Sequence, residues 1–351
     1  MAIVQKHFLF TLFLLALLLT APMAYAQSGA IFVSPNPEAV ATIIMIPKNP
    51  SPGDTVHLTV TGGSLLDLQN STITWFQNGK LISKGVGYAS LDITTGTLGS
   101  EDDVNVQVDS PDGATAASSI SIIPTHVDLL LDSDSYIPPF YRGRALPSAG
   151  THMQAQALVY FKRSDGSFIP PNSIIYTWKV NGQVIGNVSG KGRQTAVLPA
   201  PVLFGTSNVS IEAVSTDNLF TGSASTNISS VEPILMLYED HPLFGILFHR
   251  AMGQTTTIPD SEMTFAAVPY FTQVKNPNDP QLRYHWMVNG NLIVADTNHP
   301  SEIVINADKS NGEAAITLAL NHASNFLMNA KGSWDVIFKV FDQTNAFFSN
   351  F

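Results

Sequence analysis

The chain has 351 residues, of which 13% are charged, about half the usual proportion, and its formal net charge is −10. The acidic balance argues against a broad nucleic-acid footprint and against peripheral binding to anionic lipid. Cysteine is absent, which excludes disulfides, thiolate zinc sites and a cysteine nucleophile.

The first 26 residues have the pattern of an export signal. Lys6 precedes an apolar run over residues 8–19, and Ala24-Tyr-Ala26 fits a small-x-small cleavage site. Cleavage between Ala26 and Gln27 would release an exported chain. The alternative is an uncleaved membrane anchor, because residues 8–26 are just long enough to cross a bilayer, which takes about 17–25 residues.

The first folded domain is expected over residues 27–125. Apolar residues alternate with polar ones at Val56, Leu58 and Val60, which predicts a half-buried strand. The stretch Ile73-Thr-Trp-Phe-Gln-Asn-Gly-Lys-Leu-Ile82 predicts a hairpin, because Asn-Gly between β-formers favours a two-residue turn with positive φ at both positions. Trp75 on the incoming strand is expected to point into a core.

This hairpin stretch occurs twice more, as Tyr176-Thr-Trp-Lys-Val-Asn-Gly-Gln-Val-Ile185 and Tyr284-His-Trp-Met-Val-Asn-Gly-Asn-Leu-Ile293. An interval of roughly 100 residues between copies is that of a whole domain, since solenoid units repeat every 20–50 residues or so. We therefore expect a second domain over residues 126–231 and a third over residues 232–351. Trp178 and Trp286 are the expected core residues of these domains.

A buried Trp followed by an Asn-Gly turn resembles the bacterial immunoglobulin-like and PKD-like (polycystic-kidney-disease repeat) β-sandwich modules. The resemblance implies an all-β chain of three tandem immunoglobulin-like antiparallel β-sandwiches after the signal peptide. The antibody-type disulfide of such folds is missing, which leaves the plain sandwich. The resemblance also implies protein or glycan partners.

The second domain contains a long, less regular segment over residues 132–147, and residues 235–252 of the third domain echo it in sequence. Both are rich in aromatic residues and Arg, the composition of interface hot spots. The competing interpretation is a structural brace that packs against a neighbouring domain. The candidate interface residues are Tyr136, Phe140, Tyr141, Arg142, Arg144, Phe248 and Arg250.

Signals for chemistry are weak. Asp132 and Asp134 are the best candidates for calcium, but calcium takes about six to eight oxygen ligands and no calcium-loop motif is present. The sequence contains neither a Gly-x-Ser-x-Gly elbow nor a His-Glu-x-x-His motif. No catalytic residue and no cofactor is therefore predicted.

The sequence thus predicts an exported, non-catalytic protein that serves as a spacer, adhesion module or component of an extracellular assembly. Its expected partners are other extracellular proteins or glycans, with no nucleic acid, and a membrane only through an uncleaved N-terminal segment. One alternative is an envelope-anchored ligand-binding protein that uses the Tyr/Arg-rich segments of the second and third domains. A β-sandwich hydrolase is the third possibility.

Overall fold

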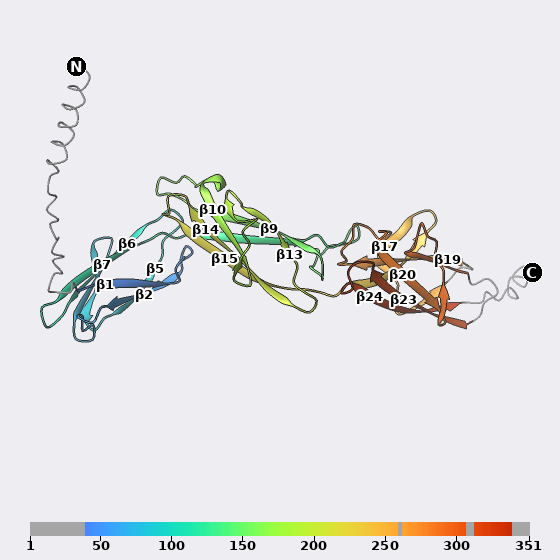
Figure 1. The fold of residues 1–351 in the computed structure, drawn as a ribbon, viewed down its shortest axis with the longest axis horizontal. Helices are drawn as coiled ribbons and strands as arrows, with labels where there is room; N and C mark the ends of the chain where they lie inside the picture. The colour runs from blue at the N-terminus through green and yellow to red at the C-terminus, as the bar shows by residue number, and fades with distance from the viewer. Residues whose placement is uncertain (1–38, 259–261, 307–311, 339–351) are drawn as a thin grey trace, which may run out of the picture.

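A computed structural model describes residues 39–258, 262–306 and 312–338. The predicted signal segment and its cleavage site at Ala26 and Gln27 lie outside these residues. Within the described ranges the chain is all-β, apart from a single 3-10 turn at Pro171–Ser173. Three sandwiches follow one another along an elongated molecule (Figure 1). No helix in these ranges has the length and apolarity that a membrane crossing requires.

The first sandwich packs a three-stranded sheet against a four-stranded sheet, and all strand pairs are antiparallel. In order across the sheets, the strands are β1 (Ala41–Ile46), β2 (Thr55–Gly62) and β5 (Ser90–Thr94), and then β4 (Lys80–Val86), β3 (Thr72–Gln77), β6 (Asp102–Asp109) and β7 (Thr115–Ile122).

The second sandwich repeats this strand order. Its sheets contain β8 (His126–Ser133), β9 (His152–Tyr160) and β13 (Thr195–Pro199), and then β11 (Gln183–Val184), β10 (Ile174–Val180), β14 (Thr206–Ser215) and β15 (Thr221–Ser229), with β12 (Gly190–Lys191) beside β10.

The third sandwich keeps the same plan and adds a strand to the edge of each sheet. The sheets are β17 (Gly245–Ala251), β16 (Ile234–His241), β19 (Glu262–Tyr270) and β22 (Glu302–Asn306), and β18 (Thr255–Ile258), β24 (Asn329–Phe338), β23 (Gly312–His322), β20 (Leu282–Val288) and β21 (Asn291–Ile293). The strand β18 runs parallel to β24, whereas the other pairs are antiparallel.

The sequence echo between residues 132–147 and 235–252 does not extend to conformation. The third sandwich forms the β16–β17 hairpin there, whereas residues 134–147 of the second form no regular strand. Similar sequence in these two segments is therefore not accompanied by similar conformation. Pro138, Pro139 and Pro147 cannot donate ladder hydrogen bonds. In the third sandwich, Gly245 supplies a positive φ of 68° at the turn, and β-formers follow it.

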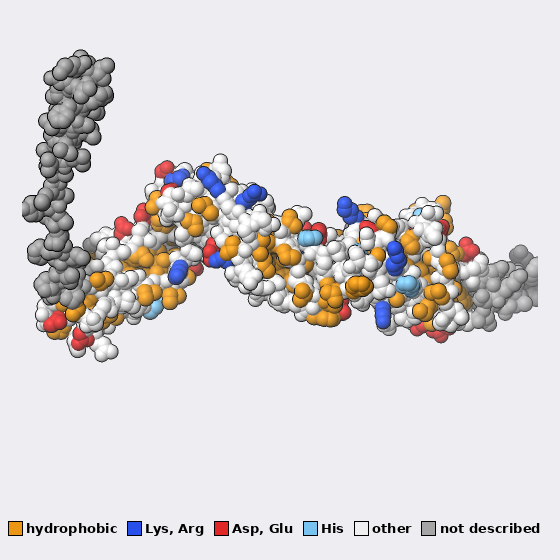
Figure 2. Space-filling model, viewed as in Figure 1, with side chains coloured by type: hydrophobic (Ala, Val, Ile, Leu, Met, Phe, Trp, Pro, Cys, Tyr) orange, Lys and Arg blue, Asp and Glu red, His pale blue; other side chains and the backbone are white. Residues whose placement is uncertain are grey.

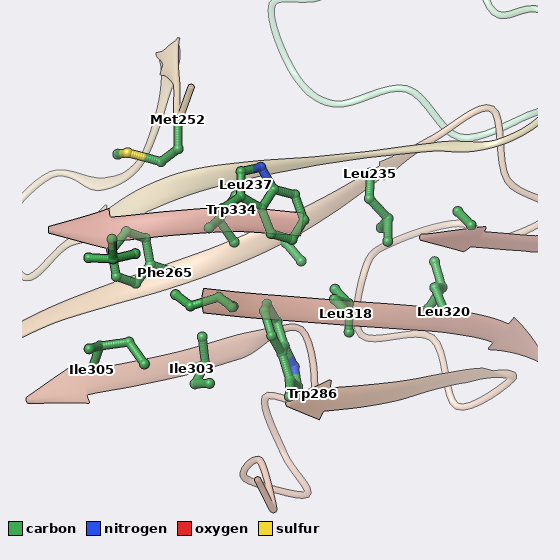
Figure 3. Close-up of a cluster of buried hydrophobic side chains, with 14 of the residues drawn as sticks. Leu235, Leu237, Met252, Phe265, Trp286, Ile303, Ile305, Leu318, Leu320 and Trp334 are labelled. Atoms are coloured by element: carbon green, nitrogen blue, oxygen red, sulfur yellow. The ribbon is translucent and has the colours of Figure 1, made fainter. Parts of the chain in front are cut away.

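Each sandwich has one fully buried Trp in its core: Trp75, Trp178 and Trp286. The indole Nε1 of each donates a hydrogen bond to a backbone carbonyl 13 to 15 residues further on. The acceptors are the oxygens of Tyr88, Arg193 and Pro300, at 2.8, 2.9 and 3.0 Å. In the third core, Trp286 lies between the sheets among aliphatic side chains (Figure 3). In each sandwich this bond satisfies the one polar group, the N–H, of an otherwise apolar buried indole.

The three Asn-Gly turns also share a contact that reaches beyond the hairpin. The asparagines have φ near 50° (50° at Asn78 and 51° at Asn181 and Asn289), and each is followed by a glycine with positive φ. Each Asn Oδ1 accepts a hydrogen bond of 2.9 Å from a backbone N–H near the start of a neighbouring strand. The asparagine therefore anchors the turn to the strand beside the Trp strand.

We expect Asn181→Gly to lower the free energy of unfolding of the second sandwich by about 1 kcal/mol, because glycine keeps the turn but loses the bond to the Asn208 N–H. Asn181→Asp keeps an acceptor oxygen and is the matched control. Urea unfolding would measure both. Equal losses for the two variants would show that the side-chain bond contributes nothing.

Candidate binding cleft between the second and third sandwiches

Residues 134–147, here named the brace, leave the second sandwich and contact the third. Tyr136 pairs with Thr272 in an isolated antiparallel bridge. The Tyr136 N–H donates to the Thr272 carbonyl at 2.8 Å, and the Phe271 N–H donates to the Tyr136 carbonyl at 2.7 Å. Further bonds cross the junction nearby, since Asn325 Nδ2 donates to the Ala149 carbonyl at 2.8 Å. The two sandwiches are therefore joined through their backbones.

The outer face of the third sandwich supports a small second core, here named the junction core. Its buried members are Tyr238, Val268, Tyr270 and Phe271, and the brace residues Tyr136, Ile137 and Leu146 pack against it. The phenol oxygens of Tyr238 and Tyr270 are 2.6 Å apart. Strand β19 is consequently buried on both faces over most of its length. These contacts support the interpretation of residues 134–147 as a structural brace against the neighbouring domain.

Beside the junction core lies an open cleft of about 610 Å³ formed by both sandwiches. One wall comes from the brace and the other from β17 and the turn before it. The lining residues are Pro139, Phe140, Tyr141, Arg142, Phe244, Ile246, Leu247, Phe248, His249 and Tyr270. Tyr141 stands edge-on to Tyr270, with ring centroids 5.5 Å apart, so its ring ties the cleft to the junction core.

Two large side chains at this cleft are almost fully in solvent: Phe140 is 90% exposed and Phe244 is 76% exposed. They come from different sandwiches and converge on one cleft. Figure 2 shows that apolar side chains gather in patches along the molecule, while acidic and basic side chains are scattered. Exposed aromatic groups beside an arginine can bury apolar area and add directional hydrogen bonds on binding.

The structure divides the predicted interface residues among different places. Phe140, Tyr141, Arg142 and Phe248 meet in the cleft, whereas Tyr136 is half-buried in the brace. Arg144 lines a separate hollow of about 200 Å³ within the second sandwich, beside Asp132. Arg250 is exposed on β17 and does not line the cleft.

Sequence reasoning missed Tyr270 and the residues Ile246 and Leu247. A signal for Tyr270 was available. The run Phe265-Ala-Ala-Val-Pro-Tyr-Phe271 is almost unbroken apolar sequence. A strand covered on both faces has such a run, whereas a half-buried strand alternates.

The two candidate calcium carboxylates bind groups of the protein. Asp132 Oδ1 accepts from the Ser133 N–H at 3.0 Å. Asp134 Oδ1 accepts from the His152 N–H at 2.7 Å, and its other oxygen lies 3.3 Å from the His152 ring. Among the described residues no group of three His, Asp or Glu is placed to hold a metal ion.

Burial raises the pKa of the Tyr270 phenol, and its hydrogen bond with Tyr238 raises it further. Burial also raises the pKa of Tyr136. The folded junction favours the neutral phenols, so this stabilisation is complete below the ordinary tyrosine pKa of about 10 and is lost as the pH rises above it.

We therefore expect the junction to lose stability as the pH rises above about 10, with a rise in tyrosinate absorbance as the phenols ionise. Tyr238→Phe should lower the pKa of Tyr270 toward its ordinary value, because it removes the hydrogen bond that favours the neutral form. Spectrophotometric titration of the wild type and the variant tests this. An unchanged titration curve in the variant would contradict the assignment.

When the short strand β12 and the added edge strands β17 and β18 are left out of the numbering, strands one, two and five of every sandwich form one sheet, and strands three, four, six and seven form the other. This order, with a buried Trp on the third strand, decides the fold. The chain is a tandem array of immunoglobulin-like sandwiches. The fold class predicted from the sequence is confirmed. The finer resemblance to PKD-like modules stays a prediction.

No family model and no curated protein matches the array. Among solved structures, it is similar to fibronectin(III)-like modules of CbhA from Clostridium thermocellum, with 15% identity over 54% of this chain and 94% of that chain and a TM-score of 0.26. It is also similar to the three N-terminal domains of the bacteriophage RB49 outer capsid protein Hoc, with 17% identity over 86% of this chain and 99% of that chain and a TM-score of 0.23.

A third similar structure is SGBP-B of the Bacteroides ovatus mixed-linkage glucan utilization locus, in complex with a mixed-linkage heptasaccharide. Identity is 12% over 85% of this chain and 70% of that chain, with a TM-score of 0.23. Similarities this distant carry no argument about function, and the fold assignment depends on the strand order of the array itself.

Proposed function

We propose that this array is an exported, non-catalytic binding component of an extracellular assembly. In this proposal the domains span residues 27–125, 126–231 and 232–351. The second and third act as one unit and present the junction cleft to another protein. The observation that carries the proposal is the meeting of two Tyr/Arg-rich segments in one cleft whose base is fixed by a buried core.

The composition of the cleft supports a binding role over a catalytic one. His249 is its only histidine, and the lining includes no Ser, Thr, Cys, Asp or Glu that could serve as a nucleophile or pair with an imidazole base. The spacer role predicted from the sequence is compatible with this proposal. The brace fixes two sandwiches relative to each other, and the exposed aromatic rings at its rim add a surface for a partner.

Export is supported by the signal-like pattern of residues 1–26 and by the low proportion of charged residues. It can be tested by producing the full chain in a secreting host and sequencing the N-terminus of the extracytoplasmic product. Export with cleavage predicts Gln27 as the first residue. A product that keeps residues 1–26 in the membrane fraction would support the uncleaved anchor, and retention in the cytoplasm would refute export.

Binding at the cleft can be tested with a photo-crosslinking amino acid at position 140 or 244 in producing cells. The matched control is Val294, which is 89% exposed on the third sandwich and outside the cleft lining. We expect positions 140 and 244 to crosslink to the same protein and position 294 not to do so. Crosslinks at position 294 with none at positions 140 and 244 would refute the cleft as the binding surface.

A further inference from the structure

The cleft has an unbalanced charge that points to the chemistry of its partner. Arg142 and His249 are its basic groups, and no Asp or Glu lines it. Arg142 has neither an ion pair nor a hydrogen bond to any other side chain in the described part of the chain. The chain as a whole carries a net charge of −10, so this cationic, aromatic cleft differs from the rest of the surface.

Acidic residues do lie one strand away. Glu239 and Asp240 are half-buried on β16, next to β17, but they do not line the cleft. Among the described residues they form no ion pair with Arg142 or Arg250. The guanidinium of Arg142 is therefore available for a carboxylate from outside, which it can bind through two parallel hydrogen bonds.

The apolar part of the cleft is built for insertion of a side chain. Phe140 has a φ of 65°, in the left-handed region that bulky residues rarely adopt. Such a conformation persists where the surroundings impose it. Here Tyr136 and Leu146, which lie on either side of Phe140 in the brace, pack against the junction core. The result is a solvent-exposed phenyl ring that lines the same cleft as Tyr141. Leu243 is 83% exposed in the turn that also carries Phe244.

The pairing of β17 shapes the opposite wall. Tyr238 pairs with Ala251 and Asp240 pairs with Ile246, so the segment of β17 between these pairs is longer than the facing segment of β16 and arches outward. Bulges of this kind re-aim side chains and also blunt a sheet edge against strand pairing. Phe248 packs against Tyr238 at 5.6 Å between ring centroids, and His249 lines the cleft. A partner would therefore bind by inserting side chains and not by adding a strand.

We infer that the cleft receives a short segment of another protein in which an apolar anchor lies beside a carboxylate. The anchor would fill the space between the aromatic rings, and the carboxylate would pair with Arg142. This inference rests on the proposed function and specifies its partner.

Other occupants fit less well. An oligosaccharide needs many hydrogen-bonding groups, whereas the lining offers few, and the Tyr270 hydroxyl is already paired with Tyr238. A two-fold dimer through this cleft would bring two acidic chains together and place like arginines near each other.

The inference can be tested with three fluorescein-labelled decapeptides and the chain from residue 27 onward. The first contains Phe-Glu-Leu-Asp between Gly-Ser flanks, the second replaces both acids with Lys, and the third replaces both apolar residues with Ser. Fluorescence anisotropy should show that the first binds at least tenfold more tightly than the other two. We expect Arg142→Gln to weaken binding of the first peptide about tenfold, which corresponds to about 1.4 kcal/mol of binding free energy.

Arg144→Gln is the matched control, because Arg144 is also exposed on the brace but lines a different hollow. It should leave peptide binding unchanged. Equal binding of the acidic and lysine peptides, equal effects of the two Arg variants, or no binding of the first peptide at about 1 mM would each overturn the inference. Even if the peptide results overturn the inference, crosslinking to a protein at positions 140 and 244 would still support the proposed function. The absence of crosslinks at these positions would refute the proposed function whatever the peptides show.

Discussion

Trp75→Ala should unfold the first sandwich while the second and third stay folded. The indole is fully buried, and truncation of a buried Trp costs about 3–5 kcal/mol, much of the 5–15 kcal/mol or so that holds a typical domain together. The core around Trp75 shares no buried residue with the core around Trp178. Contacts across the first junction include polar bonds such as that from Thr125 Oγ1 to the Thr221 carbonyl, at 2.7 Å.

Differential scanning calorimetry would show this result as an early, separate transition for one sandwich. Trp178→Ala is the informative comparison, because the second sandwich is joined to the third through the junction core. Its loss should also shift the transition of the third sandwich. Trp75→Phe should have a smaller effect than Trp75→Ala, since it keeps an aromatic ring and loses the bond to the Tyr88 carbonyl. A uniform shift of all transitions in Trp75→Ala would contradict independent cores.

Tyr136→Ala should separate the unfolding of the second and third sandwiches. The half-buried side chain contributes to the junction core, and its removal is expected to cost about 2 kcal/mol, roughly half the loss for a fully buried aromatic ring. The cost falls on the coupling between the sandwiches, because Tyr136 comes from the brace of the second sandwich and packs against both the junction core and the core of the third sandwich. Calorimetry should resolve one joint transition into two, and small-angle scattering should show a wider range of shapes.

Phe140→Ala is the control for Tyr136→Ala, because it lies on the same brace and is 90% exposed. It should leave the transitions in place and weaken binding of the acidic peptide. If Phe140→Ala also separates the two transitions, the cleft wall and the brace are one structural element, and the distinction between them fails.

The strand pattern and the Trp hairpins were predictable because both depend on residues close in sequence. The partners of those residues were not. The bond from Asn181 Oδ1 to the Asn208 N–H and the bond from Trp178 Nε1 to the Arg193 carbonyl join positions that only the folded sandwich brings together. Composition identified the Tyr/Arg segments as unusual, but it could not show that they meet in one cleft.

Arg142 and Arg144 show the same limit at closer range. Both belong to the same sequence cluster, yet one lines the junction cleft and the other a hollow inside the second sandwich. The β16–β17 hairpin was missed for a different reason: its sequence echoes the brace, but it lacks the three prolines that keep the brace out of a sheet.

The parallel pairing of β18 with β24 has a consequence for a chain stretched between two anchor points. Thr255 pairs with Asp335 and Ile258 pairs with Phe338, so the chain enters this pair at one end and leaves it at the other. Tension along the chain would slide the two strands past each other and load all their hydrogen bonds together, instead of opening them one at a time. The third sandwich would then resist extension at this pair after the strands ahead of it had given way.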